Sequence, residues 1–493
     1  MVFLGAVLVL AGMIVGCAGT RPESESGQKI SLKPCHLSAP GSTERLSAQC
    51  GSLTVFENHA ARSGRQIELR IAMIPAISRT PEPDPVLYIT GGPGGASTQD
   101  FVATSSAFDR MNEKRDILMV DQRGTGQSHP LECEAPEEEL DFENETLLKA
   151  EIERCIDQID GDPRFYSTQA AVQDLDQVRS AMGYEKLNIY GVSYGSRVAQ
   201  TYLRSYPQHV RTVILDGVLP QDEALGVSVA SDAQKTLDAV FARCAADVDC
   251  SEAFPGLPDA LAALLERVAK EPVAVELYNP YTGEPTEEIF TQGKLGTAIR
   301  LFSYRSETAA LLPLLIHDAH TTGDLSRLAA QSMIVTEQLQ GSINYALHNS
   351  VVCTEDAPFL RQEGKFVGNE QAEKNAYLGG FYQQLEGICR NWPTAEIPSD
   401  FKTLVRSEIP VLLLSGELDP VTPQDNAEHI SEELPNSLHL VGPGQGHGLI
   451  MRGCTHKVAA DFVERGTVDG LDTDCVQDLK PDPFFLSFTG PKP

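Results

Sequence analysis

The stretch Leu187–Gly195, which reads LNIYGVSYG, decides how the rest of the chain is interpreted. It begins with apolar, β-prone residues and ends in the pattern G-x-S-x-G, and a helix-compatible segment follows. A serine at a sharp strand-to-helix turn needs nearly side-chain-free neighbours, which Gly191 and Gly195 provide. The start of the next helix also favours negative charge beside that serine. The flanking pattern therefore predicts a nucleophile, Ser193, rather than an ordinary glycine-rich turn.

Short apolar runs typical of buried strands recur along the chain. Several are continuous rather than alternating, as in a parallel sheet that is covered on both faces. The runs are Ile67–Met73, Val86–Thr90, Ile117–Val120, Leu187–Val192, Thr212–Asp216, Val411–Ser415 and Leu438–Val441. Helical patterns over Ser167–Met182 and Tyr194–Tyr206 complete βαβ units. The sequence thus predicts an α/β fold with a mostly parallel central sheet flanked by helices.

Residues 220–400 are dominated instead by helical periodicity. The expected helices are Asp232–Ala246, Leu257–Lys270, Gly296–Tyr304, Thr308–His320 and Leu325–Gln340. We interpret this part as a helical cap domain inserted over the carboxyl ends of the strands. The core then consists of residues 35–219 and 401–493.

The N-terminus has the features of an export signal. Residues 2–16 are apolar or small, and this run is too short for a comfortable membrane span. It ends in IVGC at Cys17, which resembles the bacterial lipoprotein signal, although no Lys or Arg precedes the apolar run. Plain secretion after cleavage near Ala18 or Gly19 is the alternative. We expect a lipoprotein signal peptide at 1–17 and a flexible tether at 18–34. The expected location is the bacterial cell envelope, in the periplasm, with a lipid anchor to a membrane.

The cysteines support export. Besides Cys17 the chain has ten, and pairing in order along the chain is the simplest hypothesis for an oxidising compartment. The pairs would be Cys35 with Cys50, Cys133 with Cys155, Cys244 with Cys250, Cys353 with Cys389, and Cys454 with Cys475. There is no C-x-x-C and no close Cys/His cluster, so a metal site is not expected.

The net charge of −30 argues against nucleic acid as a partner, because a polyphosphate would be repelled.

Two C-terminal loops offer the groups that a serine nucleophile needs, a base and an acid that orients it. Asp419 and His447 each follow a predicted strand, at the sheet edge that carries Ser193. Glu417 is the rival acid. Asp419 is preferred because it lies two residues farther from the strand end than Glu417, and because the prolines that follow it would fix its loop.

A glycine-rich loop at residues 90–95 (TGGPGG) follows another predicted strand. It lacks the G-K-[ST] and G-x-G-x-x-G patterns of phosphate-binding loops. We therefore expect the backbone N–H groups of Tyr194 and Gly92 to form an oxyanion hole.

Three motifs together resemble the proline iminopeptidase family of α/β-hydrolases: GGPGG at 91–95, DQRGTGQS at 121–128 and GVSYG at 191–195. The C-terminal run from 409 to 475 is similar to the secreted tripeptidyl-aminopeptidase-like branch. The resemblance covers roughly residues 50–475, and it implies a serine peptidase without a cofactor that cleaves at the free N-terminus of peptides. Where the family has the histidine of H-G-G-P-G this chain has threonine, so no role of that histidine is transferred.

The resemblance also implies an acidic segment that holds the substrate's ammonium group. We expect Glu355, and secondarily Asp356, to do so, against the alternative of a solvated acidic pair. Arg123 is expected to hold neighbouring loops together, and Trp392 to pack within the cap.

The expected function is that of an exported aminopeptidase with a peptide substrate, in which Ser193 is acylated, His447 moves the proton and Asp419 orients the imidazole. A carboxylic-ester hydrolase with the same triad is the alternative. A non-catalytic binding lipoprotein on an inactive hydrolase fold is a third reading. The sequence does not indicate an oligomeric state.

Overall fold

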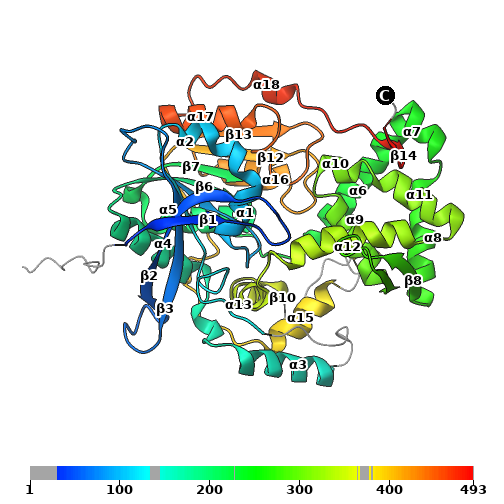
Figure 1. Cartoon of the computed structure of the whole chain (residues 1–493), viewed down its shortest axis with the longest axis horizontal. Helices are drawn as coiled ribbons and strands as arrows, with labels where there is room; N and C mark the ends of the chain where they lie inside the picture. Colours follow the sequence, from blue (N-terminus) through cyan, green and yellow to red (C-terminus); the bar gives the residue numbers. More distant parts are fainter. Residues whose placement is uncertain are drawn as a thin grey trace, which may run out of the picture.

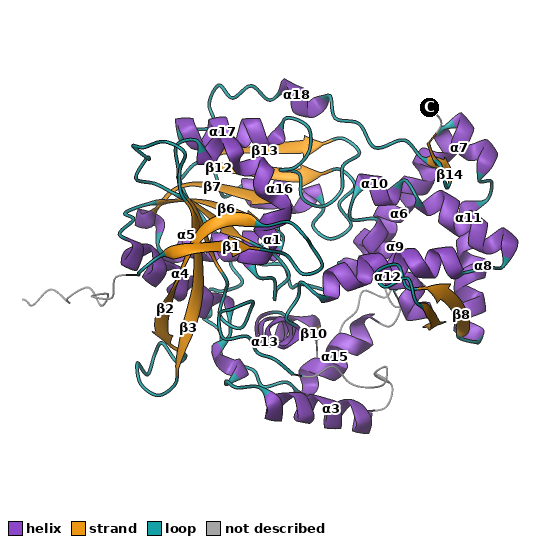
Figure 2. Cartoon of the chain, in the orientation of Figure 1, coloured by secondary structure: helices purple, strands orange, loops and turns teal. Residues whose placement is uncertain are grey.

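The computed structural model describes residues 30–133, 145–226, 228–362, 365–366, 377–378 and 381–491. The expected signal peptide at 1–17, with Cys17, and most of the tether at 18–34 lie outside the described residues. Figures 1 and 2 show a sheet with helices on both faces and a second, mainly helical lobe beside it. None of the described helices is both long and apolar enough to cross a membrane.

The central sheet has nine strands in the order β1-β2-β3-β5-β4-β6-β7-β12-β13. They are β1 Lys33–Leu37, β2 Leu46–Phe56, β3 Gln66–Ile74, β4 Val86–Ile89, β5 Ile117–Val120, β6 Leu187–Val192, β7 Val210–Asp216, β12 Val411–Gly416 and β13 Ser437–Gly442. Strands β1 to β3 pair in antiparallel fashion with one another and with β5, and from β5 to β13 all pairs are parallel. The predicted α/β fold is confirmed, and all seven predicted strands belong to this sheet.

Strands β1 and β2 were not predicted. In β2 the buried side chains alternate with more exposed ones, and the strand includes Ser47, Gln49, Gly51 and Ser52. Such a strand, covered well on one face only, lacks the continuous apolar run by which the buried parallel strands are recognised.

Helices cover both faces of the sheet, because each central strand sends alternate side chains to opposite sides. Leu87 and Ile89 of β4 pack in one core with the helices α4 Thr168–Met182 and α5 Tyr194–Ser205, whereas Val86 and Tyr88 pack in another with α1 Ser97–Thr104 and α17 Thr455–Arg465. The other α-helices described in this lobe are α2 Asp109–Asn112, α3 Glu145–Gln158, α13 Tyr345–Glu355, α15 Phe381–Asn391, α16 Gln424–Ser431 and α18 Asp474–Gln477.

The second lobe, which we call the helical lobe (residues 229–340), has an apolar core of its own. Its elements are α6 Val229–Ala246, α7 Val248–Ala253, α8 Leu257–Lys270, β8 Val273–Tyr278, β9 Pro285–Phe290, α9 Gln292–Phe302, α10 Ser306–Ala309, α11 Leu312–Thr322 and α12 Ser326–Gln340. The five predicted helices are present, but the one expected over Thr308–His320 is divided into α10 and α11, with Pro313 in the first turn of α11. The hairpin of β8 and β9 was not predicted.

The helical lobe is shorter than the predicted cap. Helices α13 and α15 pack in the core of the sheet lobe, and so does Trp392, whose indole N–H donates to the Ser350 hydroxyl at 3.1 Å. The expectation that Trp392 packs within the cap was therefore wrong. Conversely, Phe484 from the C-terminal segment, just before β14 Phe485–Ser487, belongs to the core of the helical lobe. Two short hairpins complete the described chain: β10 Arg361–Gln362 with β11 Lys365–Phe366, and β14 with β15 Gly490–Pro491.

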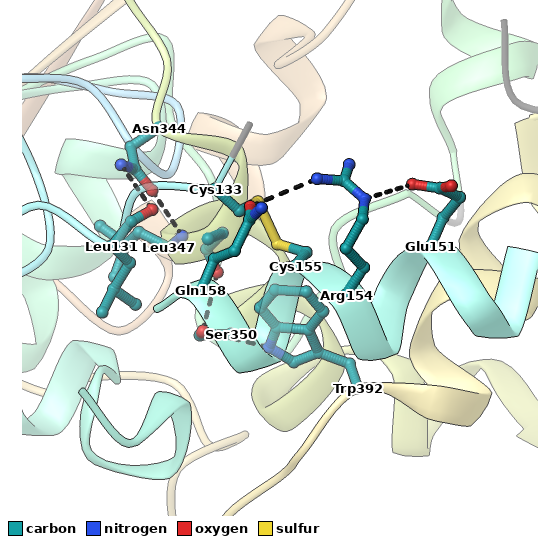
Figure 3. Close-up of a disulfide and its surroundings, with 11 residues drawn as sticks. Leu131, Cys133, Glu151, Arg154, Cys155, Gln158, Asn344, Leu347, Ser350 and Trp392 are labelled. Atoms are coloured by element: carbon teal, nitrogen blue, oxygen red, sulfur yellow. Dashed lines mark hydrogen bonds and ion pairs between the residues drawn. A yellow bond between two sulfur atoms is a disulfide. The ribbon is translucent and has the colours of Figure 1, made fainter. Parts of the chain in front are cut away.

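Five disulfide bonds join the ten cysteines in the predicted order. Figure 3 shows the Cys133–Cys155 bond, which links α3 to the segment around Leu131. The Leu131 carbonyl accepts a hydrogen bond from the Asn344 amide at 3.0 Å, at the start of α13. The disulfide thus secures the segment on which α13 rests.

Candidate active site

Ser193 occupies the turn between β6 and α5 in a strained conformation. Its φ of 57° lies in a region that L-residues other than glycine rarely adopt. A Cβ added to Gly191 would lie 2.3 Å from the Gly195 carbonyl oxygen, and one added to Gly195 would lie 2.4 Å from the Ile89 oxygen. Both glycines are therefore required by the close approach of the backbone, and the turn holds Ser193 at the carboxyl end of the strand.

His447 is paired with Asp419. The imidazole Nδ1 lies 2.7 Å from Asp419 Oδ2, and the Thr422 hydroxyl donates to the same oxygen at 2.8 Å. The Glu417 carboxylate instead accepts the Gly444 N–H, so Asp419 rather than Glu417 contacts the histidine. With Nδ1–H donated to the carboxylate, Nε2 is the nitrogen left to accept a proton.

Two opposing effects set the pKa of His447. Burial alone would lower it, but the charge of Asp419 and its hydrogen bond to the ring outweigh burial and raise the pKa above its ordinary value. Asp419 itself is 2% exposed, so water screens this pair weakly.

The structure brings Ser193 and the His447 loop to the same end of the sheet. The Ser193 N–H donates to the Asp216 carbonyl at 2.9 Å, and a Cβ on the next residue, Gly217, would lie 2.9 Å from His447 Cε1. Within the described residues no hydrogen bond joins the Ser193 hydroxyl to the imidazole. Catalytic hydrogen bonds often tighten only when substrate is bound.

Asp216, at the end of β7, fixes the backbone that follows His447. Its fully buried carboxylate accepts the N–H groups of Leu449 at 2.7 Å and Ile450 at 2.9 Å, and also the Tyr190 hydroxyl. This role of Asp216 was not predicted from the sequence. An acidic side chain that closes an otherwise apolar strand is the signal that could have found it.

The helical lobe contributes a second support for His447 that was also missed. The His447 N–H donates to the Tyr304 carbonyl at 2.7 Å, and the two rings meet edge to face with their centres 5.5 Å apart. A Cβ on Gly446 would lie 2.3 Å from that carbonyl oxygen, so glycine is needed there.

The glycine-rich loop lies against Ser193. A Cβ on Gly91 would be 2.7 Å from Ser193 Cβ, and Gly92, the next residue, has a φ of 121°. Tyr194 is the first residue of α5, where a backbone N–H has no acceptor within the helix. This arrangement is compatible with the predicted donor roles of the Gly92 and Tyr194 N–H groups.

Segments around the glycine-rich loop hold it in place. The Asn344 N–H donates to the Gly94 carbonyl at 2.9 Å, and His348 Nδ1 lies 3.2 Å from the Pro93 carbonyl. The hydroxyl of Thr90, which stands where the resembling family has histidine, donates to Asp100 at 2.7 Å. The loop is thus held by α13 on one side and α1 on the other.

The expected ammonium-binding pair is not available to a substrate, and that expectation is corrected. Glu355 and Asp356 are both 0% exposed. Asp356 accepts hydrogen bonds from Arg197 at 2.9 and 3.0 Å and from Lys402 at 2.5 Å, so two cations already balance its charge.

Glu355 is occupied as well. Its carboxylate accepts the N–H and the hydroxyl of Thr168, both at 2.6 Å, and that hydroxyl lies 2.6 Å from the Tyr194 hydroxyl. Burial raises the pKa of Glu355 to about 7, and the hydrogen bonds from Thr168 oppose the rise only in part.

Arg123 has the structural role that was expected. Its guanidinium is 1% exposed and contacts both oxygens of Asp174, at 2.6 and 2.8 Å, and the carbonyls of Glu57 and Phe165. Among the described residues no three His, Cys, Asp or Glu side chains are grouped as metal ligands would be.

Comparison with known proteins agrees with the geometry. A family model described as "alpha/beta hydrolase fold" matches residues 84–252, which include Ser193, and one described as "TAP-like protein" matches residues 376–475, which include Asp419 and His447.

Three relatives match most of the chain. "Serine protease Hip1" of Mycobacterium tuberculosis is 24% identical over 510 residues, 95% of each chain. "Tripeptidyl aminopeptidase" of Streptomyces lividans is 25% identical over 491 residues, 88% of this chain and 85% of the relative. "Carboxylesterase B" of Mycobacterium tuberculosis is 23% identical over 524 residues, 96% of this chain and 98% of the relative. The chain is a hydrolase with the α/β-hydrolase fold, and its C-terminal part matches the TAP-like model.

Proposed function

We propose that the protein is an exported serine peptidase that removes residues from the free N-terminus of peptides through an acyl-enzyme. The observation that carries the proposal is the buried Asp419–His447 pair at the same end of the sheet as the strained Ser193. Relatives named for serine protease and tripeptidyl aminopeptidase activity, which match at least 85% of the chain, support a peptide substrate.

In the proposed reaction the Ser193 hydroxyl attacks the scissile carbonyl while His447 Nε2 takes its proton. Asp419 stabilises the imidazolium that forms. The negative oxygen of the tetrahedral intermediate accepts the N–H groups of Tyr194 and Gly92. His447 then gives the proton to the leaving amine, and the C–N bond breaks. Water, deprotonated by His447, next attacks the acyl-enzyme and releases the acid and the free serine.

Export is part of the proposal. Five disulfide bonds in the described chain are typical of proteins that fold in an oxidising compartment. We assign Cys17 as the site of lipidation, with the signal peptide at 1–17 removed. Mass spectrometry of the mature N-terminus tests this assignment, and a chain that begins at or beyond residue 18 contradicts it.

A panel of chromogenic aminoacyl, tripeptidyl and acyl-ester substrates, each with a free and a blocked amine, tests the activity. We expect peptide turnover that requires the free amine and is lost in Ser193→Ala. Turnover that is equal for free and blocked amines would contradict an aminopeptidase.

A carboxylic-ester hydrolase is the second candidate, favoured by the relative named "Carboxylesterase B". Turnover of the esters alone would establish it. Failure of a fluorophosphonate probe to label Ser193 would remove both candidates and leave a non-catalytic binding protein.

A further inference from the structure

Arg300, in the last turn of α9, is a cation without a carboxylate partner. No Asp or Glu oxygen of the described chain lies within 4 Å of its guanidinium, and its Nε is buried without a hydrogen-bond partner. Three buried arginines of the described part are each paired with an aspartate: Arg115 with Asp84, Arg123 with Asp174 and Arg197 with Asp356. Arg243, which also lacks a carboxylate partner in the described chain, donates to a backbone carbonyl instead. The Arg300 side chain as a whole is partly exposed, so its guanidinium carries a charge that no carboxylate of the described chain balances and that a ligand can approach.

Arg300 lies beside Tyr304, a residue that contacts His447. Its guanidinium carbon lies 5.6 Å from the centre of the Tyr304 ring, and this ring lies 5.5 Å from the ring of His447. The Tyr304 carbonyl also accepts the His447 N–H. Arg300 is therefore separated from the imidazole by one aromatic ring.

The charge of Arg300 also reaches the glycine-rich loop. His348, whose Nδ1 lies 3.2 Å from the Pro93 carbonyl, has a pKa lowered first by burial and further by Arg300. At His447, burial lowers the pKa and Asp419 raises it. The charge of Arg300 lowers this pKa as well, by less than burial does. The charge of Arg300 thus acts on His447 and on His348, which contacts the glycine-rich loop.

A carboxylate is the group that such a cation would bind. The planar guanidinium presents donors in a fork that matches a carboxylate, and hydrogen bonds between charged partners are the strong ones. The chain carries a net charge of −30, which repels an acidic substrate at long range, so any preference for one depends on local positive charge such as that of Arg300.

We propose that Arg300 binds a carboxylate of the substrate and makes the enzyme selective for acidic peptides. The carboxylate belongs either to an acidic side chain or to the C-terminus of a short peptide. This inference rests on the proposed peptidase function and assigns it a substrate class.

Two sets of free-amine peptides test the proposal and distinguish the two sources. In the first, otherwise identical short peptides end in a carboxylate or a carboxamide. In the second, amidated peptides carry glutamate or glutamine at each position in turn. We expect the wild type to prefer one acidic form by at least about tenfold in kcat/KM.

In Arg300→Gln we expect kcat/KM for the preferred acidic peptide to fall about 10- to 100-fold, and kcat/KM for its neutral partner to change less than about threefold. Arg300→Lys should recover part of the preference. Arg267→Gln removes an exposed arginine of the same lobe and should retain the full preference. Thermal unfolding shows which variants are folded, and Arg300→Met is a second neutral variant if Arg300→Gln is unstable.

A wild type without acidic preference overturns the proposal, as does an equal loss on acidic and neutral peptides in Arg300→Gln. If esters are cleaved and peptides are not, the peptidase function fails. The role of Arg300 is then decided by the same comparison on acyl esters that carry a carboxylate or a carboxamide.

Discussion

Two regions of the sheet lobe each hold buried acidic side chains, and they differ in the partner that each acid has. Asp419 faces an imidazole, which can gain and lose a proton. At the end of α13, Asp356 faces the permanent cation of Arg197, and Glu355 faces the neutral Thr168. The residue type is nearly the same in all three cases. The partner therefore determines the role of each acid. Asp419 can stabilise a protonated imidazole, Asp356 balances a buried cation, and Glu355, which accepts hydrogen bonds from a neutral residue, has a raised pKa.

The largest expected effect comes from a substitution that breaks the Asp419–His447 pair. Asp419→Asn removes the charge that stabilises the imidazolium and favours the wrong imidazole tautomer, so kcat should fall about 10⁴-fold. Steady-state kinetics on the best substrate measures this. Glu417→Gln, the matched control, should cost less than about tenfold. Similar losses in the two variants would mean that the acid has been assigned wrongly.

The second effect concerns stability rather than chemistry. Asp356→Asn leaves Arg197 buried with its charge unbalanced, and the free energy of unfolding should fall by about 3–5 kcal/mol. Urea unfolding measures the change. Asp461→Asn breaks an exposed pair with Arg110 and should cost less than about 1 kcal/mol. A loss of kcat in Asp356→Asn while the fold stays intact would instead return Asp356 to the active site.

The third effect is a dependence of stability on pH. Between its unfolded pKa of 4.5 and its folded pKa of about 7, Glu355 keeps its proton in the folded chain and loses it in the unfolded chain. Its contribution to stability is therefore complete below pH 4.5 and is lost as the pH rises through 7, by about 3 kcal/mol in all. Unfolding of Glu355→Gln at pH 5 and pH 8 tests this. If the free energies of unfolding of the wild type and the variant differ by the same amount at both pH values, this prediction is refuted.

The smallest effect is a displacement of the pH–rate profile. His447 accepts the Ser193 proton only when it is neutral, and its pKa is raised above 6.5. The logarithm of kcat/KM should rise with pH on the acid side, with a midpoint above pH 6.5. A midpoint below 6.5 would show that burial outweighs Asp419.

The sequence was sufficient to predict the positions of residues that depend on local pattern. Ser193, Asp419 and His447 each follow a buried strand, and the carboxyl ends of parallel strands share one edge of the sheet. The parallel strands themselves were recognisable as continuous apolar runs. The disulfide pairs could be proposed because each closes a short loop.

The sequence was insufficient where a role depends on contacts between distant segments. Glu355 and Asp356 have the composition of an ammonium site, but their partners Thr168 and Arg197 lie more than 150 positions away in the chain. The supports of His447 from Asp216 and Tyr304 were missed for the same reason. Hydrogen-bond partners of this kind are fixed by packing, which a single sequence does not display.

The hydrogen bond from the His447 N–H to the Tyr304 carbonyl has a mechanical consequence. His447, the proposed general base, is bonded through its own backbone to the helical lobe, while Asp419, which contacts its imidazole, belongs to the sheet lobe. A movement that separates the lobes would draw the imidazole away from its carboxylate. The position of the imidazole therefore depends on how the two lobes pack against each other.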